Sequence, residues 1–241
     1  MDIARQDMNN PEIPMVCRSC EGRQGGICGA LSTAQLLELS RHSSQRTVAT
    51  GCEIVGQGEL VSSYCSVLKG VVKLSKVMSD GRQQIVGLQF APDFVGRPYS
   101  SESAFSAEAA VETEVCIFPR KLIDRMVAET PELCQCLHNQ ALRELDEARD
   151  RMLTLGRKTA REKVASFLHL FAMHADPENQ DCAIFDLPLS RAEIGDFLGL
   201  TIETVSRQMT RLRKEGIIRI ESNRHIAVPD LDALNRASGN D

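Results

Sequence analysis

One segment near the C-terminus, residues 190–216, constrains the fold more than any other part of the chain. Ser190 and Glu193 form a capping-box pattern, in which a hydroxyl and a carboxylate each satisfy a free N–H group at a helix start. The helix that follows is expected to end at Gly199, which suits a tight turn, and Thr201 can cap a second helix. A helix, a short turn and a second helix at this spacing indicate a helix-turn-helix motif.

The second helix is expected from Ile202 to Glu215, with one apolar and one polar side. The apolar side, which we expect to be buried, comprises Ile202, Val205, Met209 and Leu212. Glu203, Ser206 and Arg207 share the opposite face, because residues three and four apart are neighbours on a helix. In the major groove an Arg can bond guanine, a Glu can accept from cytosine, and a small Ser can approach thymine or phosphate. The predicted DNA-contacting residues are Glu203, Ser206, Arg207, Thr210, Arg211 and Arg224.

A β-hairpin, or wing, is predicted over residues 217–228, with Arg224 near its tip and facing phosphate. The whole chain has a formal net charge of −5, which taken alone argues against nucleic acid as a partner. The charge is uneven, however, because residues 205–224 hold six basic side chains and two acidic ones. One basic element can bind a polyanion while the rest of the protein stays acidic, so double-stranded DNA is the predicted partner.

Upstream, from about residue 46 to residue 119, short β-rich runs alternate with turn residues. Gly70, Asp80-Gly81 and Pro92 mark three of these turns. Many short strands in one run predict an antiparallel roll or sandwich. No Ser/His/Asp order, phosphate loop or catalytic carboxylate pair stands out along the chain, so we expect a binding protein and not an enzyme.

A long helix is predicted from Pro131 to Leu155, with Thr130 as its N-cap. Seven of its residues recur at alternating steps of four and three, which is the a/d spacing of a coiled coil. This seam comprises Cys134, His138, Ala141, Leu145, Ala148, Met152 and Leu155. Such a seam usually pairs with a copy of itself, so we expect a homodimer; the alternative is that the seam packs on its own β-domain.

The predicted class is therefore α+β, with an N-terminal antiparallel β-roll, a long dimerisation helix and a C-terminal winged helix-turn-helix. The corresponding segments are 1–30, an irregular cysteine-rich arm; 31–129, the β-roll; 130–156, the dimerisation helix; and 157–241, the DNA-binding domain. Shorter elements are expected as a helix at Ser32–Ser40, a helix at Lys158–His174 and a polar loop at Asp176–Asp186.

The chain contains nine cysteines, an odd number that cannot pair fully. The N-terminus lacks the basic and apolar segments of a secretory signal, and no stretch approaches the ~20 apolar residues of a membrane helix. We therefore expect a cytoplasmic protein, in which disulfides rarely persist and cysteines with ligand spacing favour a metal or cluster.

Cys17, Cys20 and Cys28, together with the distant Cys116, offer four thiolates, which is what a [4Fe–4S] cluster takes. Zinc, which also accepts four cysteines, and a dithiol redox switch without metal are the alternatives, as is a regulator with no cofactor. The remaining cysteines are expected to be small buried hydrophobic residues. These are Cys52, Cys65, Cys134, Cys136 and Cys182.

The run from Glu193 to Arg207, which contains Leu198-Gly199-Leu200-Thr201, resembles the helix-turn-helix of the CRP/FNR superfamily. The resemblance covers nearly the whole chain, since the β-roll, the dimer helix and the winged motif occur in that family's order. It implies a homodimeric transcription regulator on a palindromic site. The set Glu203, Ser206 and Arg207 is similar to that of the FNR branch, which implies a site of the TTGAT-N4-ATCAA type.

The cysteine placement resembles that of FNR-type oxygen sensors, which implies that Cys17, Cys20, Cys28 and Cys116 hold an oxygen-labile [4Fe–4S] cluster for anaerobic gene control. The seven residues between Cys20 and Cys28 depart from the best-known spacing of five and are similar to variants in photosynthetic and nitrogen-fixing proteobacteria. Ile27, next to Cys28, could shield such a cluster from oxygen.

Three further expectations follow from the resemblance. Nucleotide-binding members carry Gly-Glu and Arg-Ser or Arg-Thr in the β-roll, whereas Gly96 is followed here by Arg97, so no cyclic nucleotide is expected. FNR relatives can carry a repelling Asp in the dimer seam, where Ala148 stands here, so we expect a dimer with and without the cluster. The turn Asp80–Gln83 is similar to the surface that FNR-type activators offer to RNA polymerase.

Overall fold

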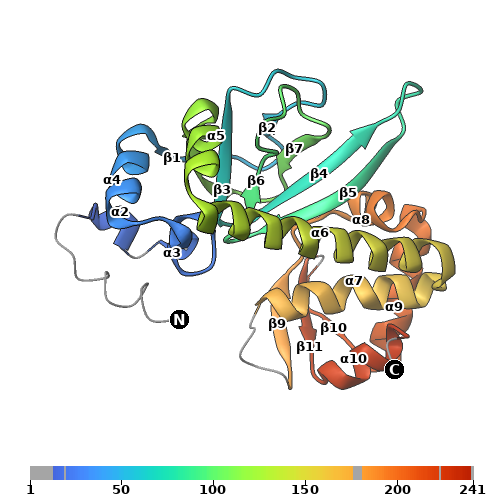
Figure 1. Ribbon diagram of the computed structural model, residues 1–241. Coiled ribbons are helices and arrows are strands. Elements are labelled where there is room, and N and C mark those ends of the chain that lie inside the picture. The colour runs from blue at the N-terminus through green and yellow to red at the C-terminus, as the bar shows by residue number, and fades with distance from the viewer. Residues whose placement is uncertain (1–12, 19, 176–180, 223, 240–241) are drawn as a thin grey trace. The chain divides into compact units, whose positions relative to one another are not determined.

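The computed structural model describes residues 13–18, 20–175, 181–222 and 224–239 (Figure 1). The chain divides within helix α6 (Pro131–Arg157) into two compact units, residues 1–146 and 147–241. The two larger sheets lie in the first unit, and helices with one small sheet make up the second. The predicted α+β class, with an N-terminal β-roll, a long helix and a winged helix-turn-helix, is confirmed.

Two four-stranded antiparallel sheets form the β-roll. The first, in the order β1-β8-β3-β6, comprises β1 (Ser44–Val48), β8 (Thr113–Pro119), β3 (Ser63–Lys69) and β6 (Phe94–Val95). The second, in the order β2-β7-β4-β5, comprises β2 (Glu53–Val55), β7 (Ser106–Ala109), β4 (Val71–Val77) and β5 (Gln83–Phe90). Alternating residues such as Val67, Val72 and Val115 are fully buried between the sheets, as the period of a strand requires.

Gly70 lets the chain leave the first sheet and enter the second. Its φ is +93°, and a Cβ at this position would lie 2.7 Å from Thr113 Oγ1 and 2.9 Å from the Glu112 carbonyl oxygen. Only glycine adopts this conformation without strain and leaves room for the neighbouring strand. The strand–glycine–strand pattern of the sequence is therefore a crossing between sheets.

The cysteine arm is more ordered than the sequence suggested. Instead of an irregular segment, the described part forms three single helical turns, α2 (Met15–Arg18), α3 (Glu21–Gln24) and η2 (Ile27–Ala30). Turns this short carry little helical periodicity, which explains why sequence reasoning missed them. Helix α4 (Thr33–His42) follows, and its capping box of Ser32 and Gln35 sets its start.

Helix α5 (Arg120–Glu129) leads into α6, which begins at Pro131 as predicted. The Gln140 side chain fastens α6 to β6, because its Oε1 accepts from the Phe94 N–H at 3.0 Å and its Nε2 donates to the Phe94 carbonyl at 2.8 Å. On the predicted seam, Leu145 and Met152 are 45% and 71% exposed. Within the first unit, the β-roll therefore leaves Leu145 uncovered.

The second unit comprises, besides the end of α6, helices and strands packed around one core. These are α7 (Ala160–Ala175), β9 (Ala183–Asp186), α8 (Arg191–Leu198), α9 (Ile202–Lys214), β10 (Arg219–Ile220), β11 (His225–Val228) and α10 (Leu231–Ala237). The rings of Phe167 and Phe197 meet edge to face at 5.7 Å between centroids. The Arg151 guanidinium lies over the Phe197 ring at 4.9 Å.

The prediction of a polar loop at Asp176–Asp186 is wrong in its second half, because β9 adds a third strand to the wing in the order β10-β11-β9. Ala183 and Phe185 are buried, whereas Ile184 and Asp186 are exposed. This two-residue alternation is the signal of a strand, but four residues are too few to stand out in the sequence.

The two helices of the motif begin and turn as the sequence predicted. The Ser190 Oγ accepts from the Glu193 N–H, and the Glu193 carboxylate accepts from the Ser190 N–H at 2.8 Å. Gly199 has a φ of +62°, and the Thr201 hydroxyl caps α9 by accepting from the Thr204 N–H at 3.2 Å.

Ile202 is an exception on the apolar side of α9. Val205, Met209 and Leu212 are buried as predicted, whereas Ile202 is 47% exposed. Side chains in a helix lean toward its N-terminus, so the first residue projects beyond the helix, where only the turn lies.

Among the described residues, no helix combines the length and the apolar character that crossing a bilayer requires.

Gly195 should be the most sensitive residue of the turn, because a Cβ there would lie 2.6 Å from the Leu200 carbonyl oxygen. We expect Gly195→Ala to lower the free energy of unfolding by about 1–3 kcal/mol through overpacking. Urea unfolding followed by circular dichroism measures the effect. Gly156→Ala in α6 is the control, since nothing lies within 4 Å of its Cβ position, and it should unfold at the wild-type midpoint or above. Equal midpoints for the two variants would contradict the close approach.

Candidate metal centre and DNA interface

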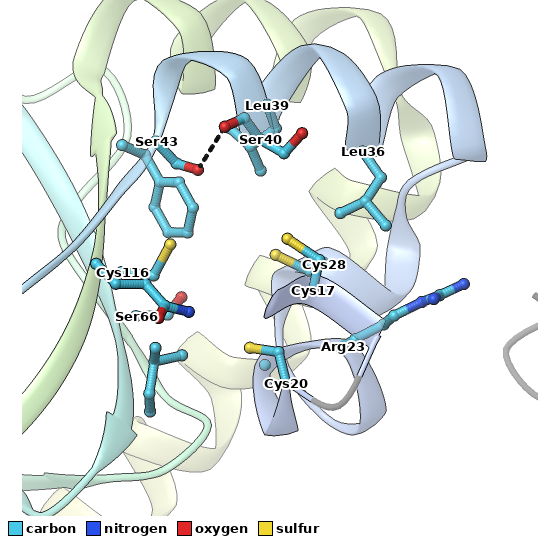
Figure 2. A pocket seen from close by; sticks show the side chains of 14 residues that line it. Cys17, Cys20, Arg23, Cys28, Leu36, Leu39, Ser40, Ser43, Ser66 and Cys116 are labelled. Carbon is cyan, nitrogen blue, oxygen red and sulfur yellow. Dashed lines mark hydrogen bonds between the residues drawn. The ribbon is translucent and has the colours of Figure 1, made fainter. Parts of the chain in front are cut away.

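All four predicted ligand cysteines line one cavity in the first unit (Figure 2). Cys17 lies in α2, Cys20 precedes α3, Cys28 lies in η2 and Cys116 lies on β8. Figure 2 shows the sulfur of Cys116 on the sheet side of the cavity, with the sulfurs of the other three opposite it. The rest of the lining is Gly22, Arg23, Leu36, Leu39, Ser40, Ser43, Gln45, Ser66, Leu68 and Phe118.

Strand alternation sends the Cys116 side chain to this cavity. Its neighbour Val115 is fully buried in the β-roll, so Cys116 projects from the opposite face of the sheet. Cys116 stands directly across from Ser66 on β3 and from Gln45 on β1. The fourth, distant cysteine of the sequence is thereby brought to the arm.

Glycines allow the arm to fold tightly against the β-roll. A Cβ on Gly26 would lie 2.8 Å from the Pro92 carbonyl oxygen, and one on Gly29 would lie 2.6 Å from the Arg23 carbonyl oxygen. Larger side chains at these two positions would force the backbone apart. The Gly-rich composition of residues 22–29 therefore serves to wrap the chain around the cavity.

The cavity disfavours negative charge on its thiols. Burial raises the pKa of Cys116 to about 11, although a hydrogen bond from the Ser43 hydroxyl opposes part of the rise. Burial also raises the pKa of Cys28, and the neighbouring Cys116 adds to that rise. Burial raises the pKa of Cys17 as well, with a further contribution from Cys20. Thiols at Cys17, Cys28 and Cys116 are thus neutral near pH 7 unless a bound cation stabilises the thiolates.

The distances between the four cysteine sulfurs help to distinguish a single zinc ion from a larger cofactor. Zinc binds four sulfurs at about 2.3 Å, which brings the sulfurs within roughly 4 Å of one another. Among the described residues, no three Cys, His, Asp or Glu side chains are grouped closely enough to hold a metal ion. Four cysteines that surround a cavity without meeting at a point fit a larger cofactor whose corners each take one sulfur.

The other cysteines depart in part from the expectation of burial. Cys65 is buried, and burial raises its pKa to about 12, whereas Cys136 is half-buried. Cys52, Cys134 and Cys182 are exposed, which corrects the prediction. Cys52 lies just before β2, Cys134 in the first turn of α6 and Cys182 just before β9, and among the described residues no core covers any of these three positions.

A second cavity of the β-roll is lined in part by Gly96 and Arg97, the positions from which the sequence predicted that no cyclic nucleotide binds. The Tyr64 hydroxyl shares its one proton between the Arg97 carbonyl at 3.1 Å and Asp124 Oδ1 at 3.0 Å, and Tyr64 lines the cavity wall. A Cβ on Gly96 would lie 2.4 Å from the Tyr64 ring. The Arg97 side chain is exposed to solvent, so the wall offers no buried cation from this position to a phosphate.

Four of the six predicted DNA-reading residues line one open groove along α9, and Glu203 and Arg224 lie outside it. The structure brings together Ser206, Arg207, Thr210 and Arg211, and it adds Lys214, which the prediction omitted. Lys214 follows Arg207 by seven residues, so the helical period alone could have identified it. Glu203 and Ser206 are exposed, and the Thr210 hydroxyl donates to the Ser206 carbonyl at 2.9 Å.

Hydrogen bonds within α9 and its cap hold the charged side chains of this face. Hydrogen bonds from its own backbone N–H and from Thr201 hold the pKa of Glu203 below its usual range, so this carboxylate is an acceptor at neutral pH. Arg207 Nη2 contacts Thr204 Oγ1 at 3.4 Å, a long bond that leaves its other donors for a base. Arg211 Nε is held by Glu215 Oε1 at 2.9 Å.

Arg224 is exposed in the wing, as predicted for a phosphate contact. Its carbonyl accepts from the Leu187 N–H at 2.9 Å, and its N–H reaches Ser222 Oγ at 3.4 Å. Backbone bonds therefore fix the segment while the guanidinium stays free to face solvent.

Residues 162–237 match the Crp-like helix-turn-helix domain family, and residues 45–130 match the cyclic nucleotide-binding domain family. A probable transcriptional activator of Rhizobium leguminosarum bv. viciae is 64% identical over 236 residues, or 98% of each chain. The transcriptional activator protein FnrL of Cereibacter sphaeroides is 38% identical over 237 residues, covering 95% of this chain and 96% of the other.

Among solved structures, FixK2 from Bradyrhizobium japonicum is similar with a TM-score of 0.73 and 32% identity, covering 81% of this chain and 96% of the other. The relatives are transcription regulators, which confirms the expectation that this chain is not an enzyme. Identity along almost the full length, the two matched domains and the shared fold agree with the resemblance found in the sequence. The chain belongs to the CRP/FNR family of transcription regulators.

Proposed function

We propose that this protein is an oxygen-responsive transcriptional activator that binds a palindromic DNA site as a homodimer and senses oxygen through a [4Fe–4S] cluster. The observation that carries the proposal is the single cavity lined by Cys17, Cys20, Cys28 and Cys116. When bound, the cluster would supply a cation centre that is labile to oxygen. Two relatives are named transcriptional activators, which supports activation and not repression of transcription.

The chain links the cysteine cavity to the dimerisation helix through one apolar cluster. Ile27 is 1% exposed and packs in the same cluster as Leu133, the buried residue of the first turn of α6. Cys28 and Leu137 pack against the same cluster from its edge. Because packed cores are hard to deform, ordering or releasing the η2 turn changes the support of α6.

Gain or loss of the cofactor would therefore change the position of the α6 seam through the packing of Ile27. The cofactor itself would not need to contact the seam. With η2 held by its cysteine, the start of α6 keeps its apolar support and the seam is set for pairing. With η2 released, Leu133 loses part of that support and the population shifts away from the DNA-competent state.

Protein purified without oxygen should be brown and contain about four irons per chain, and air should remove the iron and the colour. Cys20→Ser should lose most of the iron, because one ligand is gone. Cys182→Ser is the matched control, since this exposed cysteine lies outside the cavity, and it should keep the wild-type iron content. Zinc in place of iron, or wild-type protein that binds DNA equally with and without air, would contradict the proposal.

Recognition would rest on Glu203 and Arg207, one turn apart at the start of α9. The ionised Glu203 can accept from cytosine N4, and Arg207 can bond guanine O6 and N7 with two donors. Both bases occur in the G·C pair of a TTGAT half-site. Arg211, Lys214 and Arg224 would face phosphates, which position the helix without reading the sequence.

Arg207→Lys should weaken binding to a TTGAT-N4-ATCAA duplex by about tenfold to a hundredfold, because lysine cannot form the paired bonds to guanine. Binding to a duplex with the two G·C pairs replaced should change little. Lys214→Ala is the comparison: it should weaken both duplexes alike and reduce the salt slope by about one. Fluorescence anisotropy at several salt concentrations measures both. Equal losses on the two duplexes for Arg207→Lys would refute its role in reading guanine.

The exposed seam of α6 supports the homodimer. Leu145 and Met152 present apolar side chains that a second copy would bury, and Ala148 between them carries no charge to repel it. Leu155 is half-buried and lies against Gly199, so the last turn of the seam contributes to the chain's own core.

Sedimentation should show a dimer at micromolar concentration both with the cluster and after its loss in air. Leu145→Asp should give monomers, because a charge would be buried in the seam. Ile184→Asp on β9 is the control, since this exposed residue lies off the seam, and it should stay dimeric. A wild-type monomer in air would show that cluster binding, and not the neutral seam alone, drives association.

The turn Asp80–Gln83 is proposed as the surface offered to RNA polymerase. Arg82 is held by Asp80 at 2.8 Å, and both side chains remain exposed beside the uncovered Met78. We further propose that the β-roll binds no cyclic nucleotide, because Tyr64 occupies the wall at Gly96 and Arg97 lines the cavity from a solvent-exposed position.

A further inference from the structure

Ser66 is a residue of the cysteine cavity that the ligand set does not use. It lies on β3 directly across from Cys116 on β8, in the register of the antiparallel pair. Residues directly opposite one another project from the same face of a sheet, with Cβ atoms about 4.5–5.5 Å apart. Both line the cavity, and Figure 2 shows Ser66 beside Cys116 on its sheet wall.

The Ser66 hydroxyl is buried and has no partner. The residue is 1% exposed, and among the described residues its Oγ makes no hydrogen bond. An unsatisfied hydroxyl in a protein interior is costly, so Ser66 is suited to donate to an acceptor bound in the cavity. A thiolate or sulfide sulfur at the cavity is such an acceptor.

Other polar groups of the cavity are placed differently. The Ser43 hydroxyl already has acceptors, namely the Cys116 sulfur and the Ser40 carbonyl at 3.4 Å, the latter shown as the dashed line in Figure 2. The Arg23 side chain extends away from the sulfurs in the same view. Among the described residues, the Ser66 hydroxyl therefore has no acceptor for its proton in the cavity.

We propose that Ser66 is a positioning residue that donates its hydroxyl proton to a sulfur of the cluster site, at Cys116 or beside it, and so stabilises the more negatively charged state. The inference rests on the proposed [4Fe–4S] function. Hydrogen bonds to the sulfurs are one of the factors that set a cluster's reduction potential. In a reductive titration the reductant supplies one electron to the cluster, and no bond forms or breaks. The donated hydrogen bond raises the midpoint potential of that step.

The test compares Ser66→Ala with Ser66→Thr, which keeps the hydroxyl and suits a strand. Ser75→Ala is the matched control, because Ser75 is also buried but lies on β4, outside the cavity. Each full-length protein is loaded with iron and sulfide without oxygen. The readouts are iron per chain, the midpoint potential from dithionite titration, and the rate of anaerobic iron release to a chelator.

In Ser66→Ala we expect a more negative potential, with the reduction equilibrium weakened by about twofold to tenfold, and faster iron release. Ser66→Thr and Ser75→Ala should match the wild type. An unchanged potential and release rate in Ser66→Ala would overturn the inference while leaving the cluster in place. A wild type that binds no iron–sulfur cluster would instead overturn the proposed function, and the inference with it. Thermal unfolding of the iron-free proteins shows whether Ser66→Ala differs from Ser75→Ala in folding alone.

Discussion

The apolar cluster that contains both Ile27 and Leu133 is the packing on which the organisation of the first unit depends. It joins the last turn of the cysteine arm to the first turn of α6. Both side chains are almost fully buried, so neither turn can move without leaving a void that the surrounding core cannot fill. A sensor built on Cys28 would therefore be coupled to α6 by packing, with no need for a flexible relay.

The sequence allowed prediction of the elements whose signals are local. The capping box at Ser190, the turn at Gly199 and the cap at Thr201 each follow from one or two residues and a fixed spacing. The helix-turn-helix and the polar face of α9 were predictable for this reason. Strand β9 and the turns of the arm were not, because four residues are too few to display a period.

At the cysteine cavity, Cys17, Cys20 and Cys28 together with the distant Cys116 formed the predicted ligand set, which the family resemblance also implied. Their approach to one cavity could not be derived from spacing, because it depends on the register that places Cys116 on the outer face of β8. Ser66 gave no signal at all, since a single serine in a strand is unremarkable until its cross-strand neighbour is known. Residues that act through a partner across a sheet are visible only once the pairing is known.

Helix α6 is continuous across the boundary between the two compact units, and its last turns belong to the DNA-reading unit. Arg151 covers the Phe197 ring, and Leu155 lies against Gly199. A fragment that begins at residue 157, where the sequence placed the domain border, would lack Arg151 and Leu155. The Phe197 ring would then be exposed to water. A fragment that keeps both contacts has to begin before Arg151, so it carries part of the pairing helix with it.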